Sequence, residues 1–126
     1  MSIALDIDPK LKVKSVPAYL ESIILNLMTN AVKYRNPERE SKIELKAVKE
    51  NNHVVFSVTD NGLGIDMQRY GNKLFGMYKT FHNHKDARGL GLYIIKNQIE
   101  AMGGNIQADS TPGKGSTFKV YFNEEA

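Results

Sequence analysis

Two segments of the chain have the hydrophobic spacing of an amphipathic helix, and the other hydrophobic segments alternate as strands do. The first helical segment begins at Pro17 and ends near Tyr34, and the second covers residues 90–102 and ends before Gly103. Alternating segments cover residues 2–8, 43–47, 53–59, 105–109 and 116–122. Helices with one apolar face must bury that face against another layer. The pattern therefore predicts an α/β fold, a two-layer sandwich with two or three helices on one face of a sheet.

The length and composition indicate one ordinary globular domain, residues 1–126, with a formal net charge of +3. The absence of cysteine excludes disulfides and zinc-thiolate sites. No apolar run reaches the roughly 18 residues that a membrane span needs, so we expect a soluble, cytoplasmic domain without membrane contact. The basic residues are scattered rather than clustered, and we expect no nucleic-acid partner.

The first helical segment carries an unusual polar stripe. Asn26, Asn30 and Lys33 lie at helical spacing beside the apolar stripe, at positions that should be half-buried. Amide oxygens are suitable ligands for a hard divalent cation, and a lysine beside them would meet a phosphate. Spacing alone leaves a plainer interpretation open, in which these are ordinary boundary residues of a surface helix.

Three glycine-rich segments follow or precede the expected elements. Residues 60–65 come directly after a strand, and an aspartate there can accept a hydrogen bond from an exocyclic amine, but a plain turn would look similar. Residues 88–92 open the second helix, where exposed N–H groups favour phosphate oxygens. Residues 113–116 open the last strand, and a plain hairpin turn explains them equally well.

A short helix is expected near residues 66–75, and a long loop is expected over residues 76–89. His82 and His84 in this loop are interpreted as a solvated pair.

Taken in order, five segments resemble the sequence boxes of sensor histidine kinases. Each box is a weak signal alone, but the set and its order are specific. The boxes are residues 26–34 (N box), 60–65 (G1 box), 74–78 (F box), 88–95 (G2 box) and 113–118 (G3 box).

The resemblance implies the Bergerat ATP-binding fold, a mixed sheet with its helices on one face, and Mg-ATP as ligand. By the family's pattern, Asp60 binds the adenine amine, Asn30 ligates magnesium with Asn26 beside it, and Lys33 meets a phosphate. The loop from Gly76 to Arg88 would close over the phosphates. The further ATP-binding residues that the resemblance implies are Tyr34, Gly62, Gly64, Ile65, Lys79, Arg88, Gly89, Leu90, Gly91, Leu92 and Ser116.

Two departures from the family pattern leave the contact to the γ-phosphate open. The chain has Ala87 and Arg88 where the family often has a further glycine, and no arginine near Met77 or Thr80. A third feature bears on the reaction. Related ATPases and serine kinases carry a glutamate at the place of Asn26, and an amide cannot act as a base toward water.

The expected activity is therefore transfer of the γ-phosphoryl group of ATP to a histidine, for later passage to a response regulator. None of the three histidines has the helical context of the family's phosphoacceptor. We therefore expect a catalytic domain excised from a longer parent protein. That parent has a separate histidine-containing dimerisation domain and can be membrane-anchored. Alone, it should bind nucleotide without phosphorylating itself. The alternatives are a Bergerat-fold serine kinase or ATPase, and a non-catalytic, nucleotide-dependent interaction module.

Overall fold

The computed structural model describes residues 1–11, 13, 16–71, 74–75 and 91–123. The strands and helices of this part of the chain follow one another in the order that the hydrophobic spacing predicts. The elements are β1 (Ser2–Ile7), α1 (Pro17–Lys33), β2 (Lys42–Glu50), β3 (His53–Asp60), α2 (Met67–Tyr70), α3 (Gly91–Ala101), β4 (Asn105–Thr111) and β5 (Gly115–Asn123).

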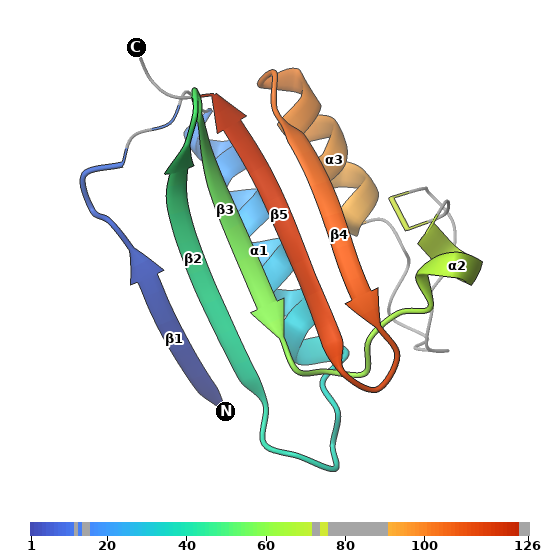
Figure 1. Cartoon of the computed structure of the whole chain (residues 1–126). Helices are drawn as coiled ribbons and strands as arrows, with labels where there is room; N and C mark the ends of the chain where they lie inside the picture. The colour runs from blue at the N-terminus through green and yellow to red at the C-terminus, as the bar shows by residue number, and fades with distance from the viewer. Residues whose placement is uncertain (12, 14–15, 72–73, 76–90, 124–126) are drawn as a thin grey trace.

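The strands form one mixed, five-stranded sheet in the order β1-β2-β3-β5-β4. β1 pairs with β2 in parallel, whereas the other neighbouring strands are antiparallel. Helices α1 and α3 lie side by side on one face of the sheet, while the short α2 lies to the side of β4, at the edge of the sheet (Figure 1). The two-layer α/β sandwich predicted from the sequence is confirmed, with two of the described helices forming the second layer.

The core lies between the two helices and the sheet. Each helix buries one stripe of residues three or four positions apart, as its spacing predicts. Strand β5 buries alternate residues on the face that meets the helices. The buried residues of these elements are Ile23, Leu27 and Ala31 of α1, Leu92, Ile95 and Ile99 of α3, and Ser116, Phe118, Val120 and Phe122 of β5.

Several elements differ in length from the sequence expectation. Helix α2 ends at Tyr70, well short of the expected residue 75, although Asp66 caps its start by accepting a hydrogen bond from the Arg69 backbone N–H at 3.2 Å. Phe75 packs instead edge-on against the ring of Phe118, with 6.4 Å between ring centroids. Strands β4 and β5 extend to Thr111 and from Gly115, so the turn between them is shorter than expected. The long loop expected over residues 76–89 lies outside the described residues.

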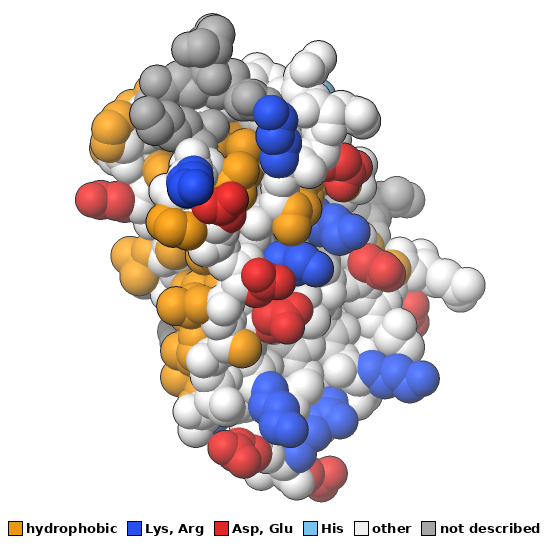
Figure 2. Space-filling model, turned by 60° about the vertical axis from the view of Figure 1, so that its left-hand side comes forward, with side chains coloured by type: hydrophobic (Ala, Val, Ile, Leu, Met, Phe, Trp, Pro, Cys, Tyr) orange, Lys and Arg blue, Asp and Glu red, His pale blue; other side chains and the backbone are white. Residues whose placement is uncertain are grey.

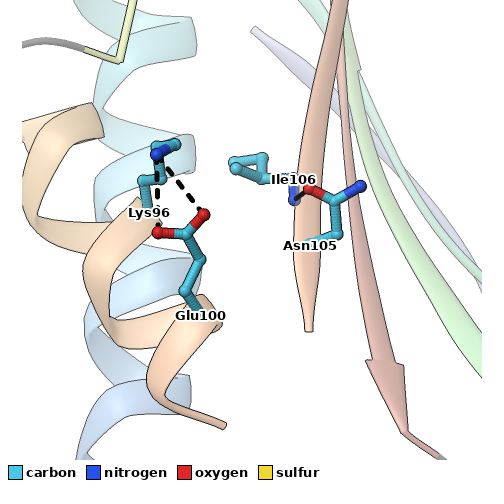
Figure 3. Close-up of polar contacts among 4 residues, drawn as sticks. All are labelled: Lys96, Glu100, Asn105 and Ile106. Carbon is cyan, nitrogen blue, oxygen red and sulfur yellow. Dashed lines mark hydrogen bonds and ion pairs between the residues drawn. The ribbon is translucent and has the colours of Figure 1, made fainter. Parts of the chain in front are cut away.

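Helix α3 ends as its glycines predict. Gly103 adopts a φ of 77°, a left-handed conformation, and the Gly104 N–H returns to the Ile99 carbonyl at 2.9 Å. On the outer side of the helix, Lys96 and Glu100 form an ion pair at 3.4 Å (Figure 3). Both side chains are solvated, so this pair contributes little to stability. None of the described helices is both long enough and apolar enough to span a lipid bilayer.

Candidate functional site

The polar stripe of α1 begins beside the first residue of α3. Asn26 is half-buried, and its Nδ2 donates to the Ser22 carbonyl oxygen at 2.8 Å, so its Oδ1 is left to face outward from α1. That Oδ1 lies 2.9 Å from the position that a Cβ on Gly91 would occupy. A side chain on residue 91 would therefore force the Asn26 carboxamide to move. The amide oxygen of Asn26 is thus next to the N-terminal end of α3, the positive end of the helix dipole.

The stripe continues along α1 toward the loop that follows β3. Asn30 is half-buried one turn further, and its carboxamide has no hydrogen-bond partner among the residues that the structure describes. Tyr34 caps the helix, and its carbonyl oxygen accepts a hydrogen bond from the Leu63 N–H at 2.9 Å. From Asn26 to Tyr34 a helix rises about 12 Å. Half-buried Lys33 also lies on this last turn.

Asp60 ends β3 at the far end of this stripe. Its Oδ1 accepts a hydrogen bond from the Gly62 N–H at 2.9 Å. Burial raises the pKa of the Asp60 carboxyl above the ordinary value of an aspartate, and hydrogen bonds from the backbone of Gly62 and Ser116 partly oppose that rise. A partly buried carboxylate with a free acceptor direction is suited to bind a ligand that donates hydrogen bonds.

Close packing of the loop after β3 explains its glycines. A Cβ on Gly62 would lie 2.6 Å from the Tyr34 carbonyl oxygen. Gly64 has a φ of 76°, and a Cβ there would collide with the Thr111 carbonyl oxygen. The loop is thus pressed against α1 on one side and the β4–β5 turn on the other.

Hydroxyl groups of β4 and β5 complete this end of the sheet. The Ile65 N–H donates to Ser110 Oγ at 2.7 Å, and Ser110 Oγ is hydrogen-bonded to Ser116 Oγ, also at 2.7 Å. Ser116 is buried opposite Asp60 in the β3–β5 register. Its hydroxyl therefore links the ends of β4 and β5.

The structure places most of the sequence-predicted site residues at one end of the sheet. The α1 stripe, Asp60, the glycine loop, Gly91 and Ser116 are linked through the contacts above, whereas Leu92 points into the core. Lys79, Arg88, Gly89 and Leu90 lie outside the described residues. Sequence reasoning missed Arg39 and Ser110, whose contacts hold the loop, because neither lies in a glycine-rich or periodic segment.

This geometry defines a class of domain: an α/β sandwich in which one polar stripe has a helix N-terminus at one end and a partly buried carboxylate at the other. Residues 15–126 match the sequence profile of the histidine kinase-, DNA gyrase B- and HSP90-like ATPases. The chain belongs to this family of ATP-binding domains.

Curated relatives narrow the family to sensor histidine kinases. The chain is 34% identical over 112 residues to the circadian input-output histidine kinase CikA of Synechococcus elongatus, covering 86% of this chain and 15% of the relative. It is 34% identical over 123 residues to the phosphate regulon sensor protein PhoR of Pseudomonas aeruginosa, covering 95% of this chain and 27% of that protein. The chain thus corresponds to about a quarter or less of the length of these relatives.

Solved structures agree in fold. The mycobacterial sensor histidine kinase MprB superposes with a TM-score of 0.85 at 21% identity, covering 98% of this chain and 84% of that chain. Full-length ShkA in complex with AMPPNP superposes with a TM-score of 0.79 at 28% identity, covering 99% of this chain and 26% of that chain. The resemblance predicted from the five sequence boxes is confirmed: the chain is a domain of the ATP-binding catalytic type found in sensor histidine kinases.

Proposed function

We propose that this domain binds Mg-ATP and transfers its γ-phosphoryl group to a histidine on a separate helical dimerisation domain of the same parent protein. The observation that carries the proposal is the position of the polar stripe of α1. The stripe begins at Asn26, next to Gly91 at the start of α3, and ends at Tyr34, next to Gly62 and Asp60. In this assignment the Asp60 carboxylate accepts a hydrogen bond from the adenine amine, and the triphosphate extends along α1 toward Asn26.

Asn30 fits the role of a magnesium ligand. Its half-buried carboxamide has no competing hydrogen bond within the described part of the chain, and an amide oxygen is a hard ligand. The described residues hold no cluster of three or more histidine, cysteine or acidic residues, so phosphate oxygens would supply most of the remaining coordination. When bound, the ion neutralises charge on the phosphates. Lys33 and the start of α3 add positive potential along the same path.

The reaction that suits these residues is in-line transfer to a nitrogen nucleophile. A neutral imidazole attacks the γ-phosphorus with its own lone pair, the bond from that phosphorus to the bridging oxygen breaks, and ADP leaves with the bonding electrons. The Asn26 carboxamide cannot act as a base toward water, because the nitrogen lone pair of an amide is delocalised and its oxygen is only a very weak base. Hydrolysis should therefore be slow, and the domain alone should not phosphorylate itself.

A transfer assay tests the proposal. The domain is mixed with γ-labelled ATP, magnesium and a histidine-bearing helical dimerisation domain, with the histidine of that partner replaced in a control. Label that appears on the partner and depends on its histidine supports the proposal. Bound nucleotide without transfer points to an interaction module, and rapid release of phosphate without a partner points to an ATPase. Either result contradicts it.

Asn30→Ala tests the assignment of magnesium. We expect the variant to lose most of the increase in triphosphate affinity that magnesium gives, because the chain's amide ligand is removed. Calorimetry with a non-hydrolysable ATP analogue, with and without magnesium, measures this difference. ADP binding without magnesium is the control and should stay near the wild-type value. An unchanged magnesium dependence would remove Asn30 as a ligand.

A further inference from the structure

Arg39 joins three segments that are distant in sequence. It lies in the connection between α1 and β2, and its Nε donates to the Asn61 carbonyl oxygen at 2.8 Å. Its Nη2 donates to the carbonyl oxygens of Gly62 at 3.0 Å and of Gly113 at 2.6 Å. One guanidinium thus connects the loop after β3 with the β4–β5 turn. A planar group with several fixed donors is suited to such bridging, and a lysine is not equivalent to it.

The same connection is also held from the side of the loop. Asn61 Oδ1 accepts the Lys42 N–H at 2.8 Å, and Asn61 Nδ2 donates to the Glu40 carbonyl oxygen at 2.9 Å. The Asn61 backbone N–H adds a bond to the Lys42 carbonyl oxygen at 3.3 Å. Arg39 is therefore presented from a backbone that is itself fixed to the loop.

The turn at Gly113 depends on these polar contacts. Among the described residues, no atom beyond Gly113 and its two chain neighbours lies within 4 Å of the place that a Cβ on Gly113 would occupy, so side-chain packing does not hold the tip of the turn. Besides the bond that the Gly113 carbonyl oxygen accepts from Arg39, the Gly113 N–H donates to the Leu63 carbonyl oxygen at 2.7 Å. Gly115, two residues on, packs directly against the Asp60 carbonyl oxygen. The position of this turn thus helps to fix the backbone that carries Asp60.

Arg35 shows what an ordinary arginine of this loop does. It is exposed, and its Nη1 donates to the Val32 carbonyl oxygen at 2.9 Å, three residues away in the same helix end. Arg39 instead reaches carbonyl groups 22, 23 and 74 residues away. Such long-range contacts from one exposed side chain order the site rather than the local turn.

We propose that Arg39 is a positioning residue for the nucleotide site: it fixes the loop at residues 60–64 against the turn at residues 111–115, so that Asp60 already faces the adenine position before the nucleotide binds. This inference rests on the proposed function. Arg39 does not contact the nucleotide in this assignment. Its loss makes the free protein lose order that binding must restore, which weakens affinity.

The test is calorimetry on the whole chain with Arg39→Met, which keeps the apolar stem and removes the donors, and with Arg39→Lys as the conservative variant. Arg35→Met is the matched control. We expect Arg39→Met to raise the Kd about tenfold, equally for ADP and for a non-hydrolysable ATP analogue, with the magnesium dependence unchanged. Arg39→Lys should lie between this variant and the wild type, and Arg35→Met should bind as the wild type does.

A double-mutant cycle with Asp60→Asn separates positioning from general stability. If Arg39 acts through Asp60, Arg39→Met should weaken binding much less in the Asp60→Asn background than in the wild type. Denaturant midpoints of all variants report the folded fraction, and if Arg39→Met does not fold, Arg39→Lys decides by the same comparison.

Three results overturn the inference. They are wild-type affinity in Arg39→Met, equal losses in both backgrounds, and a loss explained by the unfolded fraction. A wild-type chain that binds no adenine nucleotide would contradict the proposed function as well. Wild-type binding that Arg39→Met leaves unchanged contradicts this inference alone.

Discussion

Ile3 and Ile43 are register partners on neighbouring strands, yet their environments differ completely. Ile43 of β2 is 2% exposed, whereas Ile3 of β1 is 47% exposed. Both point to the same face of the sheet, because parallel partners share a face. Helices α1 and α3 lie over the strands from β2 to β4 and leave β1 outside their cover (Figure 1). The difference teaches that register sets the direction of a side chain, and the second layer decides its burial.

The open edge and the covered sheet also differ in how they are held. All six residues of β1 are exposed, including Leu5 at 68% and Ile7 at 43%. Figure 2 brings this edge forward and shows hydrophobic side chains gathered along one margin of the surface. At the site end of the covered sheet, hydrogen bonds and close glycine contacts connect β3, β4, β5 and α1. Stability should therefore be concentrated away from β1.

Ile43→Ala is expected to have the largest effect on stability. It should lower the free energy of unfolding by about 2–5 kcal/mol, because it leaves a cavity in the hydrophobic core. Urea unfolding followed by circular dichroism measures the change. A loss below that of an exposed site would show that β2 is no better covered than β1.

Gly64→Ala tests whether the site end is as closely packed as its contacts indicate. The new methyl group would collide with the Thr111 carbonyl oxygen at a positive φ, so the backbone must shift. We expect a loss of stability of about 1–3 kcal/mol and weaker nucleotide binding. Gly113→Ala is the matched control: its φ is also positive, at 79°, but its surroundings are open, and it should weaken nucleotide binding less. Equal effects on binding would contradict the crowding argument.

Asp60→Asn should separate stability from binding within the site. A raised pKa means that the folded state favours the protonated acid. Protonated Asp60 therefore adds stability that is fully present below the pKa of an unfolded aspartate and is lost as pH rises through the raised value. At neutral pH the neutral amide avoids this penalty, so the variant should be at least as stable as the wild type.

Nucleotide binding should change in the opposite direction. Loss of the carboxylate acceptor should weaken adenine nucleotide affinity by about 1–3 kcal/mol. In the wild type, affinity should fall on acidification from a higher pH than an ordinary aspartate would give, and this fall should be absent in Asp60→Asn. Calorimetry between neutral and mildly acidic pH checks both. Unchanged affinity at neutral pH would contradict the role of Asp60.

Ile3→Ala is expected to have the smallest effect. The side chain is already half in water, so the loss should be less than about 1 kcal/mol, measured in the same urea experiment as Ile43→Ala. Nucleotide affinity should not change. A loss as large as that of Ile43→Ala would mean that β1 is covered in solution.

Much of the fold follows from local spacing. The apolar stripe of α1 and the alternation of β5 predict both elements within a residue or two, because each pattern reports the face that an element buries. Spacing does not report strand order, which depends on pairing between distant segments. The parallel pairing of β1 at the edge and the placement of Ser116 opposite Asp60 are therefore visible only in the structure.

The candidate site also contains residues that the sequence indicates and residues that only the structure reveals. Asn26 and Asn30 recur beside the apolar stripe of a helix and Asp60 follows a strand, and the resemblance to the family's boxes assigns these residues to a site. Arg39 carries no such signal. An arginine in a polar loop is commonplace, and its importance comes only from the distant carbonyl groups that the fold brings within its reach.

Two hydrogen bonds limit how the domain can change shape: the Gly113 N–H donates to the Leu63 carbonyl oxygen, and the Ile65 N–H donates to Ser110 Oγ. The loop at residues 60–65 and the turn at residues 110–115 cannot separate without breaking these hydrogen bonds, so the two should move together as one rigid unit when a ligand binds. Any adjustment to a bound ligand must then come from other segments of the chain.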